Sequence, residues 1–335
     1  MGRLQGLQVF YVVLAALVCL VVTGAEEPRG EAEAFLKRAR EVSDIRCEGC
    51  PPFQLRASVE LLRMPRGTSR GTYLLIWISP TKWREEIDFP GFEQVRVGGE
   101  GKVWQARSTS YLPLRLFQLM EAMSFRRRLR VGPDESVGKI KKPPRGKSSL
   151  ACLELKGKLQ ANRLFCFDPT AGVLMHEGTR SSEEDAFEYE DYAPWGAKRF
   201  PRTLRAFELG ELVVKVYVEE MSEATSVNEG LFSPPSGAVE WPGCEDPEPA
   251  LGIEKSLPHY PEQAKETRES GTVFVYAIVK ADGRVSEVEV LRSAGGDLDR
   301  ATVDAVKQWR YRPASCGGTA VPEEKVIHIV FELRQ

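Results

Sequence analysis

The sequence contains few histidines, and none of the motifs, from which enzyme active sites and metal centres are usually built. Its 335 residues include only three histidines, His176, His259 and His328, which lie far apart in the chain. No G-x-S-x-G nucleophile motif, phosphate-binding glycine loop or H-E-x-x-H metal motif occurs. We therefore expect a protein that is not an enzyme and that uses neither a metal nor another cofactor.

The chain also lacks an excess of charge of either sign. Its 46 Lys and Arg residues nearly balance its 48 Asp and Glu residues, for a formal net charge of −2. This balance gives no general attraction to nucleic acid, and we expect no nucleic-acid partner. The hydrophobic fraction of 42% is sufficient for folded cores, and the length corresponds to about two domains.

An apolar run near the N-terminus is too short for a typical membrane-spanning helix. Residues 9–22 are almost entirely apolar, follow Arg3, and precede the small residues Thr23-Gly24-Ala25. This order is typical of an export signal that is cleaved after Ala25. A membrane-spanning helix needs ~20 apolar residues, so an uncleaved anchor over residues 7–25 stays open as the alternative.

The most regular pattern lies in residues 256–335. Asp282-Gly283 between two apolar runs predicts a β-hairpin, and apolar residues at helical spacing over residues 298–309 predict a helix. An alternating strand over residues 325–333 closes the chain, and Pro261 suits the first turn of a short helix that precedes the hairpin. We expect the order helix, strand, strand, helix, strand, which forms a three-stranded sheet with its helices on one face.

The same residues resemble the TonB C-terminal domain family. The matching positions follow the family's order and spacing: Tyr260-Pro261, Gly271-Thr272-Val273, Asp282-Gly283-Arg284-Val285, Leu298-Asp299, Ala305-Val306 and Trp309-Arg310-Tyr311-Arg312-Pro313. The resemblance covers about a quarter of the chain. It implies a periplasmic domain that is not catalytic and that binds the short box peptide of TonB-dependent receptors in the outer membrane, or another envelope protein.

Strand addition is the physical route that we expect for this binding. An edge strand carries unpaired N–H and C=O groups, which can recruit an extended peptide. The partner-binding residues would be those of the last strand: Val326, Ile327, His328, Ile329, Val330 and Phe331. Two alternatives stay open: the strand belongs only to the core, or it pairs with its own copy in a homodimer.

The Pro-rich segment before this domain is much shorter than the spacer that the resemblance to TonB implies. TonB keeps an N-terminal membrane anchor and a long Pro-rich spacer, through which it acts as an energy transducer in transmembrane transport. Here residues 221–255 are the predicted Pro-rich linker, and the Pro-rich stretch from Ser233 to Pro261 has under thirty residues. At ~3.1 Å per residue such a stretch would not cross a periplasm. The short spacer therefore argues against energy transduction, and an uncleaved anchor over residues 7–25 would restore energy transduction as an alternative.

Residues 31–220 show about ten short strand patterns and two helical ones, at residues 31–42 and 112–129. This predicts an α+β fold in which a large antiparallel sheet curls into an incomplete barrel with a helix across it. Three stretches are similar to motifs of the LolA/LolB-like family of periplasmic lipoprotein carriers: Pro80–Glu86, Gly99–Trp104 and Asp168–Leu174.

The LolA/LolB resemblance implies an apolar pocket between the concave face of the sheet and the helix at residues 112–129. The expected lining residues are Trp77, Trp83, Trp104, Leu116, Phe117 and Met120. A lipid or lipoprotein carrier, with the TonB-type domain as its docking module, is thus the second functional hypothesis. The alternative for these side chains is that they fill a core, as aromatic and Met residues usually do.

Seven cysteines become six once residues 1–25 are removed, and an even number in an oxidising compartment predicts disulfides. Six cysteines allow fifteen pairings. Cys152 and Cys166 lie symmetrically about an expected hairpin turn at residues 158–160, which would place them opposite each other on two strands. Cys244 and Cys316 would then join the linker to the last domain.

Cys47-Glu48-Gly49-Cys50 admits a redox pair, half of a zinc site or a structural disulfide. Pro51-Pro52 and a strand pattern follow, where a redox pair favours a helix N-terminus, and the histidines are remote in sequence. We therefore expect a structural disulfide and no metal.

Overall fold

The computed structural model describes residues 28–64, 67–99, 102–123, 129–132, 134–141, 149–158, 162–179, 186–244 and 247–333. The export signal or anchor predicted for residues 1–25 lies outside these residues, as do residues 124–128 of the predicted second helix. Within the described ranges, no helix has the length and apolar character needed to cross a membrane.

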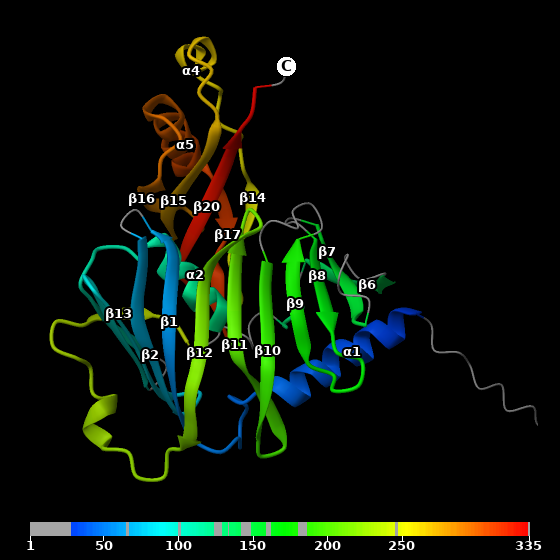
Figure 1. Cartoon of the computed structure of the whole chain (residues 1–335). Coiled ribbons are helices and arrows are strands. Elements are labelled where there is room, and N and C mark those ends of the chain that lie inside the picture. The colour runs from blue at the N-terminus through cyan, green and yellow to red at the C-terminus, as the bar shows by residue number, and fades with distance from the viewer. Residues whose placement is uncertain are drawn as a thin grey trace, which may run out of the picture.

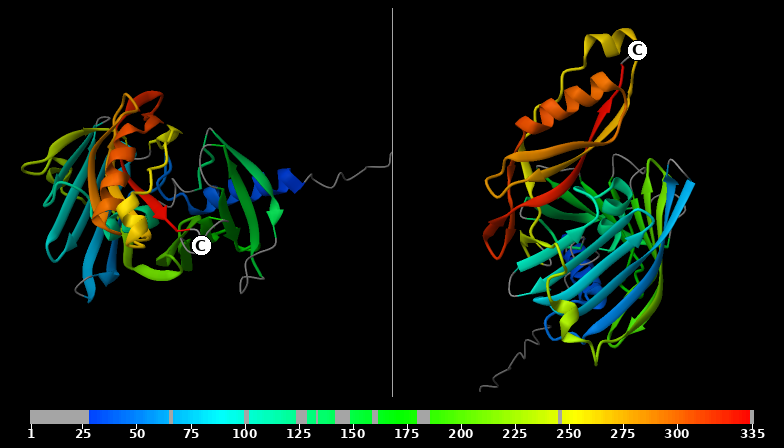
Figure 2. Two further views of the ribbon diagram at one scale, coloured as in Figure 1. Left: turned by 90° about the horizontal axis from the view of Figure 1, so that it is seen from above. Right: turned by 90° about the vertical axis from the view of Figure 1, so that its left-hand side faces the viewer.

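Most of the chain forms one curled antiparallel sheet of thirteen strands (Figures 1 and 2). Its spatial order is β13-β5-β4-β3-β2-β1-β12-β11-β10-β9-β8-β7-β6. The strands are β1 (Phe53–Met64), β2 (Gly67–Ser79), β3 (Lys82–Phe89), β4 (Phe92–Gly99), β5 (Lys102–Arg107), β6 (Glu135–Lys141), β7 (Ala151–Gly157), β8 (Arg163–Phe167), β9 (Leu174–Thr179), β10 (Ala186–Trp195), β11 (Lys198–Glu208), β12 (Glu211–Glu223) and β13 (Val239–Pro242). The predicted fold class, a curled antiparallel sheet with few helices, is confirmed.

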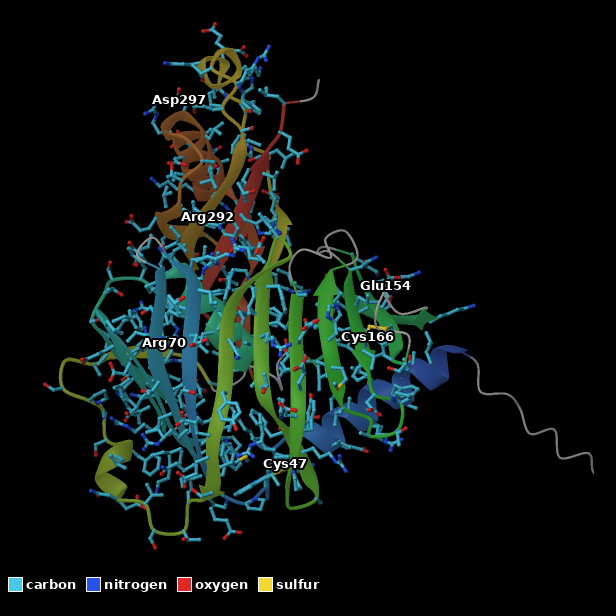
Figure 3. All side chains as sticks on the ribbon, viewed as in Figure 1. Cys47, Arg70, Glu154, Cys166, Arg292 and Asp297 are labelled. Atoms are coloured by element: carbon cyan, nitrogen blue, oxygen red, sulfur yellow. A yellow bond between two sulfur atoms is a disulfide. The ribbon has the colours of Figure 1, made fainter. Side chains whose placement is uncertain are left out.

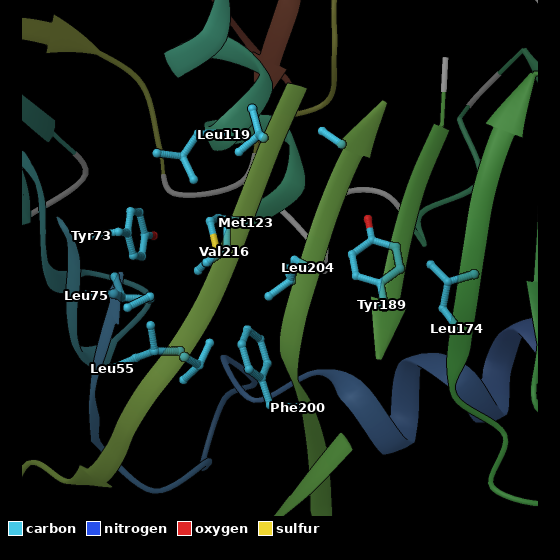
Figure 4. Close-up of a cluster of buried hydrophobic side chains, with 14 of the residues drawn as sticks. Leu55, Tyr73, Leu75, Leu119, Met123, Leu174, Tyr189, Phe200, Leu204 and Val216 are labelled. Atoms are coloured by element: carbon cyan, nitrogen blue, oxygen red, sulfur yellow. The ribbon is translucent and has the colours of Figure 1, made fainter. Parts of the chain in front are cut away.

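Two helices cover parts of this sheet. Helix α1 (Pro28–Ser43) packs against β6 and β11, and α2 (Leu114–Met123) packs against β11 and β12. Alternating residues of β1, among them Phe53, Leu55 and Ala57, are fully buried and form a core with the helices. Figure 4 shows a section of this core, in which Leu55 and Leu75 from the strands lie near Met123 of α2.

The stretch predicted as a Pro-rich linker, residues 221–255, contains three short elements. They are a 3-10 helix η1 (Glu229–Phe232), β13, and β14 (Leu251–Glu254). Strand β13 pairs with β5 and so extends the large sheet by one strand, and Trp241 packs against its core. Strand β14 pairs with a strand of the C-terminal part.

The C-terminal part has its own core and its own sheet. It comprises α4 (Glu262–Glu266), β15 (Gly271–Val279), β16 (Val285–Arg292), α5 (Gly296–Gln308), β17 (Arg310–Arg312), β18 (Ala314–Cys316), β19 (Thr319–Val321) and β20 (Glu323–Phe331). The three long strands lie in the order β16-β15-β20, and Leu298 and Val306 of α5 pack on Val273 and Val275 of β15. Figure 2 shows α5 on one face of this sheet. The predicted order of helices and strands is confirmed.

Three disulfides join the six described cysteines in the predicted pairs. Cys152 and Cys166 face each other in register on β7 and β8. Cys47–Cys50 closes the loop between α1 and β1, and Cys244–Cys316 ties the segment after β13 to β18. The last bond closes a loop of 72 positions in sequence. It fixes the end of the linker to β18 and so restricts the position of the linker relative to the C-terminal part.

Candidate peptide-docking edge

Strand β20 pairs with β15 along its whole length, from Glu323 opposite Val279 to Phe331 opposite Gly271. No other strand in the described part of the chain pairs with the second side of β20. Figure 1 shows β20 beside β15, with the C-terminus of the chain beyond its far end. Strand β20 is therefore an edge strand, which is the position that strand addition requires.

The side chains of β20 alternate between core and surface. Ile327, Ile329 and Phe331 are buried in the C-terminal core, whereas His328 is exposed and Val330 is 54% exposed. This alternation fixes the register of the strand, because a slip by one residue would bring His328 and Val330 into the core. The backbone edge is thereby held in a defined position for a partner.

The beginning of β20 is covered by other parts of the chain. The Glu323 carboxylate accepts a hydrogen bond from the Ala250 N–H (2.8 Å), and the Lys325 ammonium donates to the Ala250 carbonyl (3.4 Å). Glu324 forms an ion pair with Arg107 at the end of β5 (2.8 Å). These contacts occupy residues 323–325 and place the predicted partner-binding residues, 326–331, in the remainder of the strand.

Glu208, at the end of β11, connects the two parts of the molecule. Its carboxylate accepts hydrogen bonds from Arg115 and Gln118 of α2, both at 2.9 Å, and from Arg292 of β16. Figure 3 shows Arg292 at the junction. Burial alone would raise the pKa of Glu208, but the hydrogen bond and charge of Arg292, together with the charge of Arg115, lower it below its ordinary value.

A second polar contact lies on the same face of the C-terminal sheet. The Tyr276 hydroxyl donates to Glu324 (2.5 Å), and the Tyr276 ring lies against Tyr111 with 5.9 Å between ring centroids. Burial, followed by the negative charge of Glu324, raises the pKa of Tyr276. The face of the C-terminal sheet opposite α5 therefore lies over the first part of the chain.

An open groove of about 1110 Å³ adjoins the end of β20. Residues at the end of β20 and the start of β15, including Val330, Phe331 and Gly271, form one wall. Lys265 and Arg268 lie beyond them, and Leu209, at the turn between β11 and β12, contributes from the large sheet. The sequence predictions did not include Leu209, whose only sequence signal is a Leu-Gly pair between two strand patterns.

The residues predicted to line a lipid pocket are divided between two environments. Trp77, Trp83 and Leu116 are buried members of the large core, and Trp104 is half-buried. Phe117 and Met120 of α2 line a cavity of about 130 Å³ between the large sheet and the segment that precedes β20. The structure therefore does not bring all six side chains together around this cavity.

A family model and curated relatives match the C-terminal part of the chain. Residues 256–333 match the family model described as Gram-negative bacterial TonB protein C-terminal. Protein tonB2 of Pseudomonas aeruginosa is 37% identical over 82 residues, which cover 24% of this chain and 30% of the relative. Protein TonB of Vibrio cholerae is 28% identical over 116 residues, covering 34% of this chain and 44% of the relative. The chain thus spans less than half the length of these relatives.

Solved structures resemble each part at a low level. A LolA superfamily protein from Nitrosomonas europaea aligns with 60% of this chain and 97% of its own, with a TM-score of 0.42 and 12% identity. The C-terminal domain of Pseudomonas aeruginosa TonB aligns with 26% of this chain and 88% of its own, with a TM-score of 0.24 and 26% identity. The motifs quoted from residues 256–333 predicted the family whose model matches these residues, the TonB C-terminal family.

Proposed function

We propose that this protein is a TonB-like protein of the bacterial periplasm whose C-terminal domain binds an extended peptide of an outer-membrane receptor or another envelope protein. The observation that carries the proposal is the edge position of β20, with residues 326–331 beyond the contacts that cover its beginning. A bound peptide would add a fourth strand to the sheet β16-β15-β20 through main-chain hydrogen bonds.

The position of the edge strand supports binding without rearrangement of the fold. The buried residues of β20 hold it on the C-terminal core, and its pairing with β15 is complete. A peptide therefore meets a strand that is already ordered, which lowers the entropic cost of binding. The export signal in residues 1–25 would deliver the domain to the compartment in which such receptors expose their periplasmic segments.

The described residues give less support to the second hypothesis, that the protein carries a lipid or lipoprotein. Three of the six proposed lining residues fill the large core, and the cavity that Phe117 and Met120 line has about 130 Å³. Small-molecule sites usually have ~300–1,000 Å³. We therefore propose that the large curled sheet acts as the support for the docking edge.

A peptide selection tests this function. The full chain would be used to select binders from a random-peptide library displayed on phage, and enriched sequences would be synthesised with a fluorescent label. We expect peptides that slow amide hydrogen exchange over residues 326–331 and that lose binding when alternate backbone nitrogens are methylated, because a methylated nitrogen cannot donate to the edge. A selection without enriched binders, or binders that protect only other residues, would contradict the proposal.

A further inference from the structure

Leu209 combines two unfavourable features at one exposed position. It forms, with Gly210, a two-residue turn between β11 and β12, whose flanking residues Glu208 and Glu211 are paired. Both turn residues have positive φ, 51° for Leu209 and 72° for Gly210. The Leu209 side chain is 52% exposed.

Neither feature follows from the needs of the hairpin itself. A two-residue turn with positive φ at both positions favours Asn, Asp or Gly, because a side chain with a bulky Cβ substituent strains the left-handed conformation. A leucine that is 52% exposed also leaves about half of its apolar surface in water in the free protein. A half-exposed apolar residue in a left-handed backbone conformation is an outlier from which a functional role can be inferred.

The hairpin tip is fixed beside the C-terminal sheet. Glu208, the residue before Leu209, accepts hydrogen bonds from Arg115 and Gln118 on one side of the junction and from Arg292 on the other. Each of these bonds involves a charged carboxylate and is therefore strong. Leu209 thus has a defined position relative to β20, although the two lie in different sheets.

The face of β20 that bears Val330 is continuous with the junction. In the antiparallel pair, Val326, His328 and Val330 lie opposite Tyr276, Phe274 and Thr272, respectively. Directly opposed residues point to the same face of a sheet, and Tyr276 packs on Tyr111 of the first part. Val330 and Thr272 therefore continue the face that lies over the first part of the chain, and both line the groove with Leu209.

We propose that the β11–β12 turn is the second half of the peptide-docking site. The proposal deepens the proposed function and rests on it. A peptide added to β20 places alternate side chains on the face of Val330, where an apolar side chain packs between Val330 and Leu209. Two basic side chains, Lys265 and Arg268, and one acidic side chain, Glu332, line the same groove among its described residues. Lys265 is already paired with Glu262 on its own helix (2.7 Å), so a carboxylate of the peptide at this end would meet Arg268.

Substitution of Leu209 by Asn tests the contribution of Leu209 to peptide binding without a loss of stability. Asn suits the positive φ of the turn, so the L209N variant should unfold at the same temperature as the wild type or higher. The same change removes the apolar surface, and we expect the affinity for the enriched, fluorescently labelled peptides to fall about tenfold. The matched control is Leu257→Asn, because Leu257 is 84% exposed and does not line the groove.

The outcomes distinguish this inference from the function on which it rests. Loss of affinity in L209N but not in L257N, with enriched peptides that contain an apolar and an acidic residue, supports the second half of the site. Equal affinity of L209N and wild type, while residues 326–331 are still protected by the peptide, overturns this inference and leaves strand addition in place. A selection that yields no binder to the wild type overturns both.

Discussion

At the scale of single residues, Glu208 accepts hydrogen bonds from both parts of the molecule. The residue is only 5% exposed, and its partners Arg115, Gln118 and Arg292 come from a helix of the first part and a strand of the second. A buried carboxylate with charged partners is costly to remove, because the partners then remain desolvated without a counter-charge. The orientation of the C-terminal part therefore depends strongly on this side chain.

We expect Glu208→Gln to lower the free energy of unfolding by about 2 kcal/mol, because Arg115 and Arg292 would then face a neutral amide instead of a carboxylate. The matched control is Glu211→Gln in the same hairpin. Glu211 pairs with Arg63, but both side chains are more than half exposed, so this change should cost under about 0.5 kcal/mol. Denaturation in urea measures both values. Equal effects of the two substitutions would show that the junction does not depend on Glu208.

The lowered pKa of Glu208 predicts an acid-sensitive junction. A group whose pKa is lower in the folded state stabilises that state above its unfolded pKa and loses this effect as the pH falls through its folded pKa. The difference in unfolding free energy between wild type and E208Q should thus be constant near neutral pH and shrink below about 4.5, the ordinary value. A difference that stays the same from pH 7 to pH 3 would contradict this assignment.

At the scale of elements, the hairpin at Asp282-Gly283 illustrates a turn that the sequence specifies almost completely. Gly283 has a φ of 79°, and its carbonyl accepts a hydrogen bond from the Tyr311 N–H (2.9 Å). A Cβ at this position would lie 2.1 Å from the Tyr311 carbonyl oxygen. The turn therefore requires glycine both for its backbone conformation and for the close approach of β17.

Gly283→Ala should therefore lower the free energy of unfolding by about 3 kcal/mol, from left-handed strain together with the displacement of β17. Gly317→Ala is the comparison, because Gly317 also has a positive φ of 56° but open space around its Cβ position. There we expect a loss of about 1 kcal/mol, from strain alone. Thermal unfolding monitored by circular dichroism measures the two changes, and a G283A protein as stable as G317A would exclude the steric argument.

The elements that were predicted correctly are those with a strong local signal. The Asp-Gly turn, the apolar spacing of α5 and the alternation of β20 each follow from neighbouring residues. The pairing of β13 with β5 was missed, because four residues, Val239–Pro242, carry no information about a partner more than a hundred positions away. The short pair β18–β19 was missed as well, since each of its strands has three residues.

The same reasoning explains which part of the candidate site could be predicted. Residues 326–331 lie on one strand with a clear alternation, so the sequence alone predicts the strand that carries them. Leu209 comes to the same groove through contacts such as that of Glu208 with Arg292, which are 84 positions apart in sequence. A contact of that kind depends on how two separate cores pack, and no local pattern predicts it.

At the scale of the whole molecule, the junction and the Cys244–Cys316 disulfide hold the C-terminal sheet on the end of the large sheet (Figure 1). This arrangement holds the beginning of β20 and places the end of the strand, Val330 and Phe331, at the groove that Leu209 also lines. In the proposed function the large sheet is the support for the docking edge, and that edge must be open in the free protein.

The most direct test is the hydrogen-exchange rate of each amide of β20 in the free, full chain, measured by NMR. In an edge strand, alternate amides bond to β15 while those between them point away from the sheet. We predict that slow and fast exchange alternate from Val326 to Phe331 and that the fast amides become slow when an enriched peptide binds. Slow exchange at all six positions in the free chain would show that the edge is already occupied, and would contradict the account.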